Sequence, residues 1–171
     1  MKKLGIVIAI VLIGLVAVGD GNFNTCSAAD TIKIGIVLPL TGRHSPFGHH
    51  IKRAFDLALE EINAAGGAKG KKLEFIYGDD QSKPETGLTA AGKIIEDDDV
   101  IMLTGEYSSS CTYPIAGLAQ KKKIPFMVST AAADKITQSG WTYIFRMDQP
   151  ASEFDSGLQD LFQALSLRLV I

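Results

Sequence analysis

The stretch Ile32–Leu38, IKIGIVL, is followed by Pro39 and Gly42 and decides which fold class the chain can adopt. Apart from Lys33 and Gly35, the run consists of large aliphatic residues. A short run that is apolar on both faces and bounded by Pro and Gly is typical of a strand inside a parallel sheet. Such a strand needs a covering layer on each face, so helices should alternate with strands along the chain.

This alternation is visible beyond the first strand. Further apolar stretches that read as strands are Leu73–Tyr77, Val100–Leu103, Ile124–Val128 and Tyr143–Arg146. Between them, apolar residues recur at helical spacing, and two segments have helix-start signals: Ser45-Pro46 as N-cap and first turn, and Ser82–Glu85 as a capping box. The sequence therefore predicts an α/β, Rossmann-like fold, with a parallel sheet, helices on both faces and right-handed crossovers.

The first 29 residues have the order of a secretory signal peptide. A positive start at Met1–Lys3 is followed by Leu4–Val18, which contains only Leu, Ile, Val, Ala and Gly, and then by the small residues Ser27–Ala29. Fifteen residues in a helix span about 22 Å, which is short of a membrane core of about 30 Å. We therefore predict cleavage after Ala29 and a periplasmic or extracytoplasmic location. Lipid attachment at Cys26 is an alternative, although Phe23–Thr25 match such a signal poorly.

Charge and cysteine usage exclude several classes of protein. Without residues 1–29 the chain has 15 basic and 18 acidic side chains, which argues against nucleic acid or anionic membranes as partners. Cys111 is then the one remaining cysteine, so neither an internal disulfide nor a multi-cysteine metal site is expected. We expect Cys111 to be a buried, small apolar residue.

In an open parallel sheet, ligands bind beyond the carboxyl ends of the strands, where the strand order reverses. The loops expected at this edge are Thr41–Phe47, Asp79–Ser82, Gly105–Cys111 and Ser129–Ala133. Phe47 and Tyr107 are the aromatic residues in these loops that we expect to line a pocket, with ordinary core packing as the alternative.

The loop GEYSSSC, residues 105–111, admits three readings. A serine nucleophile would need a nearby base and a Gly-x-Ser-x-Gly setting, and no glycine follows these serines. Helix capping explains one serine but not three in succession. A carboxylate cradle uses all of them, because a helix N-terminus offers free N–H groups and serine hydroxyls add neutral donors.

No metal site or cofactor is expected. His44, His49 and His50 lie at one predicted helix start, and neighbouring histidines on a helix point in different directions. The pair Asp79-Asp80 is too few oxygen ligands for Ca²⁺ or Mg²⁺, so these carboxylates read as polar loop residues.

Five segments in order carry a family resemblance: IKIGIVLPLTG, EEINAAGG, KLEFIYGDDQS, TGEYSSSC and IPFMVSTAAADKIT. From about Ile32 to about Asp160 the chain resembles the periplasmic substrate-binding proteins of ABC transporters for branched-chain amino acids. The resemblance implies a type I periplasmic-binding fold, whose two lobes close on a branched-chain amino acid or a similar small acid or amide. It also implies a transporter permease as partner and no enzymatic activity.

The resemblance also assigns site residues. Ser108 and Ser109 match the loop that holds the ligand carboxylate, and Ala131 and Ala132 match a loop whose backbone meets the ligand. Ala133 stands where relatives often have Thr, and Phe47 where they often have Tyr, so this pocket should be less polar.

The chain is shorter than members of this family usually are. The resemblance implies a signal peptide over 1–29, the first segment of the N-terminal lobe over 30–147, and a crossover into a truncated second lobe over 148–171. Such a chain is expected to bind ligand with impaired affinity. The alternatives are a ligand-sensing domain of the same fold and, from another class, a small α/β serine hydrolase using Ser108–Ser110.

Overall fold

The computed structural model describes residues 31–165 of the 171-residue chain. The predicted signal peptide, with Cys26, and residues 166–171 lie outside the described residues. Strands and helices alternate throughout the described part. In chain order they are β1 (Ile32–Leu38), α2 (Ser45–Ala64), β2 (Leu73–Asp79), α3 (Pro84–Asp97), β3 (Met102–Gly105), α4 (Ser109–Lys122), β4 (Phe126–Val128), α5 (Lys135–Gln138), β5 (Ile144–Arg146) and α6 (Ala151–Ala164).

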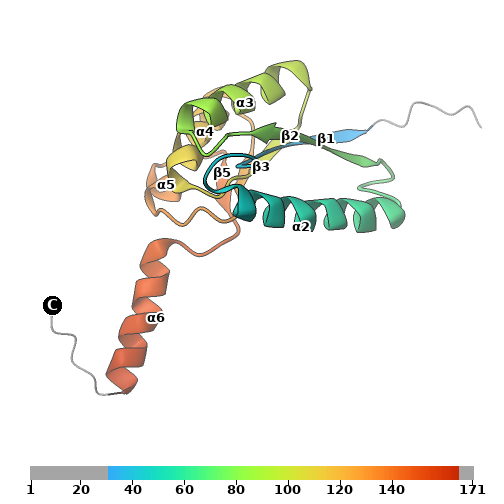
Figure 1. Cartoon of the computed structure of the whole chain (residues 1–171). Coiled ribbons are helices and arrows are strands. Elements are labelled where there is room, and N and C mark those ends of the chain that lie inside the picture. The colour runs from blue at the N-terminus through green and yellow to red at the C-terminus, as the bar shows by residue number, and fades with distance from the viewer. Residues whose placement is uncertain (1–30, 166–171) are drawn as a thin grey trace, which may run out of the picture. The chain divides into compact units, whose positions relative to one another are not determined.

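The five strands form one parallel sheet in the order β2-β1-β3-β4-β5 (Figure 1). From β1 the chain first adds β2 on one side, and then places β3, β4 and β5 on the other. The order therefore reverses between β1 and β3, which is the position where open α/β sheets bind ligands. The predicted fold class is confirmed.

Helices α3 and α4 pack on one face of this sheet (Figure 1). Leu103, Phe126, Val128 and Ile144 point into this layer and are buried with side chains of α3 and α4. The approach is close at Gly35, because a Cβ there would lie 2.5 Å from Ile94 and 2.6 Å from Leu103. Glycine in the first strand is thus required by helix–sheet packing.

Helix α2 covers the other face over β1 and β2 (Figure 1). The Phe55 and Phe75 rings meet edge to face with centroids 6.0 Å apart, and the Tyr77 hydroxyl donates to Asp56 Oδ1 at 2.7 Å. Towards β5 this cover is thinner, since Phe145 is 48% exposed. An apolar hollow of about 370 Å³ lies beside α2, lined by Ile51, Ala54, Phe55, Ala58, Ser129, Thr130 and Met147.

Both predicted helix-start signals were wrong in detail. Helix α3 has Lys83 at its N-cap position and no side-chain cap, so Ser82 and Glu85 do not form a capping box. The Ser82 hydroxyl instead accepts the His44 N–H at 3.0 Å, which ties two loops together. Helix α2 begins at Ser45, so His44 and not Ser45 is at the N-cap position, and the Ser45 N–H donates to Gly42 O at 3.2 Å.

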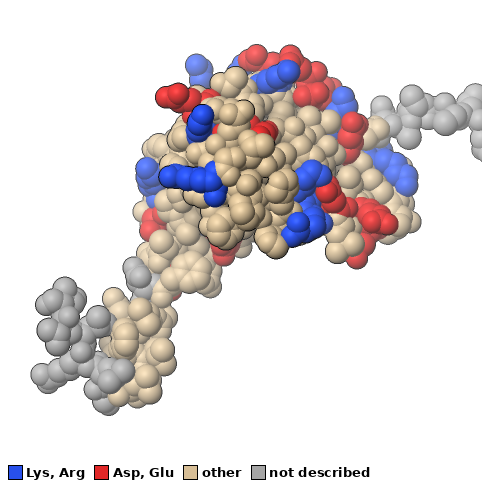
Figure 2. Space-filling view, viewed as in Figure 1, with Lys and Arg blue, Asp and Glu red and all other residues tan. Residues whose placement is uncertain are grey.

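Helix α6 spans Ala151–Ala164. Its large apolar side chains Phe154, Leu158 and Leu161 are all exposed. Among the described helices, none is both long and apolar enough to cross a membrane. Figure 2 shows basic and acidic side chains interspersed on the visible face, without a large field of one sign.

Candidate ligand-binding site

The four loops expected at the carboxyl edge do meet there. The register pairs Leu38 with Asp79, Val37 with Gly105, and Gly105 with Val128, so the four strands end at one level. The loop after β1 is tied to the end of β2 because Asp79 accepts the backbone N–H groups of Leu40 and Thr41 at 3.0 and 3.1 Å. The edge is therefore a surface built from four loops that are far apart in sequence.

Ser108, Ser109 and Ser110 begin helix α4. Ser108 occupies the N-cap position without a side-chain cap, and its hydroxyl instead lies 2.8 Å from the Ser110 hydroxyl. Among the described residues, no hydrogen bond occupies the backbone N–H groups of Ser109 and Ser110. Free N–H groups at a helix N-terminus beside neutral hydroxyls are the chemistry of a carboxylate cradle, since the helix dipole favours negative charge there.

The loop after β4 is joined to this cradle. Ser109 Oγ accepts the Ala133 N–H at 3.1 Å, so the two loops assigned to the ligand are in direct contact. Arg146, at the end of β5, donates to the carbonyls of Ala131 and Ala133 at 2.9 and 2.7 Å. Ala131 is buried, whereas Ala132 and Ala133 are partly exposed. The sequence reasoning missed Arg146, although a lone cation ending an apolar strand was an available signal.

Phe47 and Tyr107 form a stacked pair at the same edge. Their ring centroids are 4.4 Å apart and the planes differ by 8°, while His44 meets Tyr107 edge to face at 5.5 Å. Phe47 is exposed on its outer side and Tyr107 is partly exposed. The predicted aromatic wall is thus an existing stack between the start of α2 and the loop after β3. It lies next to Ser108 in the chain.

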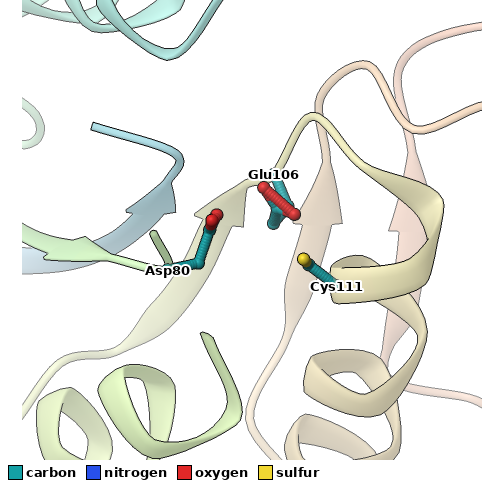
Figure 3. A group of neighbouring side chains, drawn as sticks. All are labelled: Asp80, Glu106 and Cys111. Carbon is teal, nitrogen blue, oxygen red and sulfur yellow. The ribbon is translucent and has the colours of Figure 1, made fainter. Parts of the chain in front are cut away.

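Beneath these loops lies a buried acidic pair, Asp80 and Glu106, with the Cys111 thiol beside it (Figure 3). Ligand atoms of the three residues all lie within 4.8 Å of one another, and Asp80 and Glu106 are both 0% exposed. Asp80 lies in the loop after β2, as predicted, but its side chain is fully buried, which the sequence did not indicate, and Asp79 is the last residue of β2. Cys111 is buried, as predicted.

The environment of this cluster disfavours negative charge. Burial raises the pKa of the Glu106 carboxyl to about 9, and the hydrogen bond and charge of Asp80 act in the same direction. Burial likewise raises the pKa of the Cys111 thiol to about 11, with Glu106 and Asp80 contributing. Cys111 is therefore a neutral thiol at ordinary pH, because the thiolate is the disfavoured form.

We do not assign the cluster as a metal centre. It supplies three protein ligand atoms, and no further His, Cys, Asp or Glu of residues 31–165 joins them. Structural zinc sites are almost always closed by four protein ligands, and hard cations take six or more oxygens. One oxygen of each carboxylate also accepts a backbone hydrogen bond. Asp80 Oδ1 accepts the Ser82 N–H, and Glu106 Oε1 accepts the Tyr107 N–H.

The hydrolase alternative finds no support at the serines. Within the described residues, no histidine nitrogen is hydrogen bonded to Ser108, Ser109 or Ser110; His50 Nδ1 instead lies 2.6 Å from Arg53 Nη2. The hydroxyls of Ser129 and Thr130, in the loop after β4, donate to the Glu106 carbonyl. A nucleophile needs a base within hydrogen-bond reach, and the three serines lack one here.

Comparison with known proteins identifies the architecture. The chain is 34% identical over 119 residues to a leucine-, isoleucine-, valine-, threonine- and alanine-binding protein of Pseudomonas aeruginosa, with 70% of the chain and 32% of that protein covered. It is 32% identical over 125 residues to a Leu/Ile/Val-binding protein homologue of Brucella melitensis, covering 73% of the chain and 33% of the relative. The chain thus spans about a third of the length of these relatives.

Solved structures of similar proteins match the fold of this chain. A branched-chain amino acid transporter substrate-binding protein of Streptococcus pneumoniae, in complex with isoleucine, matches with a TM-score of 0.67 and 28% identity, over 70% of this chain and 34% of the other. A solute-binding protein of an ABC transporter from Rhodopseudomonas palustris, in complex with 3,4-dihydroxybenzoic acid, matches with a TM-score of 0.65 and 30% identity, over 71% and 32%.

By their names these relatives are binding proteins, and the two solved structures are binding proteins of transporters. The periplasmic binding protein family matches residues 31–166, which is most of the chain. The parallel sheet, the reversal of strand order between β1 and β3, and this match together place the chain in the periplasmic binding protein family.

Proposed function

We propose that this chain provides one side of the ligand site of an extracytoplasmic solute-binding protein, and that its loops hold the carboxylate of a small amino acid or related organic acid. One observation carries the proposal. The free N–H groups and hydroxyls at the start of α4 face the same edge as the loop of Ala131–Ala133, and Ser109 bridges the two. Neutral donors at a helix N-terminus bind a carboxylate without a competing cation.

The aromatic stack supports an apolar body for the ligand. Phe47 and Tyr107 sit beside the cradle, and Ala133 offers a methyl group where a hydroxyl would add a polar contact. The named relatives bind isoleucine in one case and a hydroxylated benzoate in another. The feature shared by these ligands is a carboxylate on an apolar body, which is the class we propose.

The remaining assignments follow from the family. We place residues 30–147 in the N-terminal lobe and 148–171 in a crossover to a second lobe, with residues 1–29 as the export signal. The partner we propose is the permease of an ABC transporter. The chain spans about a third of its relatives' length.

The test is a backbone-amide NMR titration of the chain with leucine, isoleucine and 3,4-dihydroxybenzoate. We expect saturable shifts confined to the amides of residues 107–110 and 131–133. Leucinamide, which lacks the carboxylate, is the matched control and should leave these amides unmoved. Equal shifts with leucinamide would contradict the carboxylate cradle.

A further inference from the structure

Glu106 is hydrogen bonded to two loops of the proposed site and lies beside a third. It directly follows β3 and has a left-handed backbone, with φ at 54°. Its side-chain Oε1 accepts the Tyr107 N–H at 2.9 Å, in the loop that leads to the serines. Its main-chain carbonyl accepts the Thr130 hydroxyl at 3.0 Å and the Ser129 hydroxyl at 3.3 Å, in the loop that leads to Ala131–Ala133.

The Glu106 carboxyl group also lies beside the carboxyl group of Asp80, in the loop after β2 (Figure 3). Asp80 Oδ2 and Glu106 Oε2 are both buried, and neither has a partner as long as both groups are only acceptors. Two unpaired carboxylates in the interior would each lose hydration and repel one another. A single proton between them removes the repulsion and gives both oxygens a partner.

Within residues 31–165, no basic side chain is set against the pair to neutralise it. The titratable groups that the structure sets against Glu106 are Asp80, from the loop after β2, and Cys111, from α4. Cys111 is a neutral thiol here, so it cannot balance a negative charge. On the side of α3, Gly87 packs against the Asp80 Cβ and carries no charge.

We propose that Glu106 is a positioning residue for the carboxylate cradle, and that it acts as a neutral carboxyl group donating its proton to Asp80. The proposal rests on the proposed function of the loops. In this arrangement Glu106 fixes the loops after β2, β3 and β4 relative to one another, through its proton, its Oε1 and its carbonyl. A neutral Glu106 also reduces the charge of the pair from −2 to −1 beside a site meant for an anion.

The arrangement predicts how stability depends on pH. A carboxyl group that keeps its proton in the folded state but loses it when unfolded makes the protein less stable as pH rises. The effect begins above the ordinary carboxyl pKa and ends near pH 9, where the folded group ionises. One proton corresponds to a loss of about 3 to 5 °C in Tm per pH unit in this window.

The decisive variant is Glu106→Gln. A glutamine amide can donate to Asp80 and still accept the Tyr107 N–H, so it reproduces the neutral form at every pH. We expect the Tm of the wild type to fall relative to that of Glu106→Gln between pH 6 and pH 9, by the amount given above. Glu60→Gln, on the exposed side of α2, is the matched control and should follow the wild type. Parallel profiles for Glu106→Gln and the wild type would overturn the proposal.

Two further measurements complete the test. Glu106→Leu fills a similar volume without the hydrogen bonds, so it should shift the amides of residues 107–110 and 129–133 in the ligand-free NMR spectrum, whereas Glu106→Gln should not. Zn²⁺ added to the wild type should leave the Tm unchanged. A Zn²⁺-dependent rise that Glu106→Gln abolishes would overturn the shared proton in favour of a cation. The pH profile needs no ligand, so it stands even where the leucine titration fails.

Discussion

Ser109 Oγ accepts the backbone N–H of Ala133 at 3.1 Å, and this bond joins the start of α4 to the loop after β4. The two residues are 24 positions apart, yet both were assigned to the ligand site. The bond uses one lone pair of the hydroxyl, so its proton and the free N–H groups beside it stay available for an anion.

Replacing Ser109 by Ala should therefore affect both the loops and the ligand. We expect a loss of about 0.5–1.5 kcal/mol in the free energy of unfolding, because the Ala133 N–H loses its acceptor. The shifts caused by leucine in the amide titration should weaken severalfold. Ser139→Ala removes an exposed hydroxyl bonded to the Lys135 carbonyl and is the control. An equal effect on the titration from both variants would contradict the assigned role of Ser109.

Asp79 predicts a loss of stability in acid. Burial favours its protonated form, but hydrogen bonds from the Thr41 hydroxyl and from the backbone of Gln81, Thr41 and Leu40 prevail and lower its pKa. A lowered pKa contributes stability above the unfolded value that is lost as pH falls through the folded value. Denaturant unfolding of Asp79→Asn should thus show a smaller loss between pH 5 and pH 3 than the wild type. Asp97→Asn, on an exposed residue, should match the wild type.

Adding a single methyl group at Gly105 should strongly reduce the free energy of unfolding. The φ of Gly105 is 107°, and a Cβ would lie 2.4 Å from the Val37 carbonyl oxygen. Gly105→Ala therefore adds a backbone clash to the strain of a positive φ, and should cost about 2–4 kcal/mol in denaturant unfolding. Gly140→Ala isolates the strain, since Gly140 has a φ of 73° with open space around it, and should cost about 1–2 kcal/mol. Equal costs would show that the approach of β1 to β3 is not tight.

Substitutions of Phe145 and Phe126 should differ in their effect on stability, although the two residues lie in neighbouring strands. Phe145 is 48% exposed on the thinly covered face, whereas Phe126 is fully buried. Phe145→Thr should change stability by less than about 1 kcal/mol and reduce the binding of a hydrophobic dye such as ANS. Phe126→Ala should cost about 3–5 kcal/mol. A comparable cost for the two would mean that Phe145 is covered in solution.

Local sequence patterns were enough to predict the strands and the fold class. The run from Ile32 to Leu38 became β1 with the bounds that its composition indicated, because aliphatic residues on both faces require a two-sided cover. Boundaries were less certain where polar residues prolong a strand, as at Asp79. Helix starts failed for a related reason. The Ser82 side chain had a partner 38 residues away at His44, which no local pattern reveals.

The sequence by itself determined the alternation of strands and helices, the loops at the carboxyl edge, and the serines that begin α4. Each of these depends on neighbours within a few residues or on a family pattern. Tertiary structure alone decided that Glu106 and Asp80 share a buried contact, that Arg146 holds the Ala131–Ala133 loop, and that Ser109 reaches Ala133. Burial and hydrogen-bond partners of these groups depend on strand order, because only the order β2-β1-β3-β4-β5 brings loops distant in sequence to one edge.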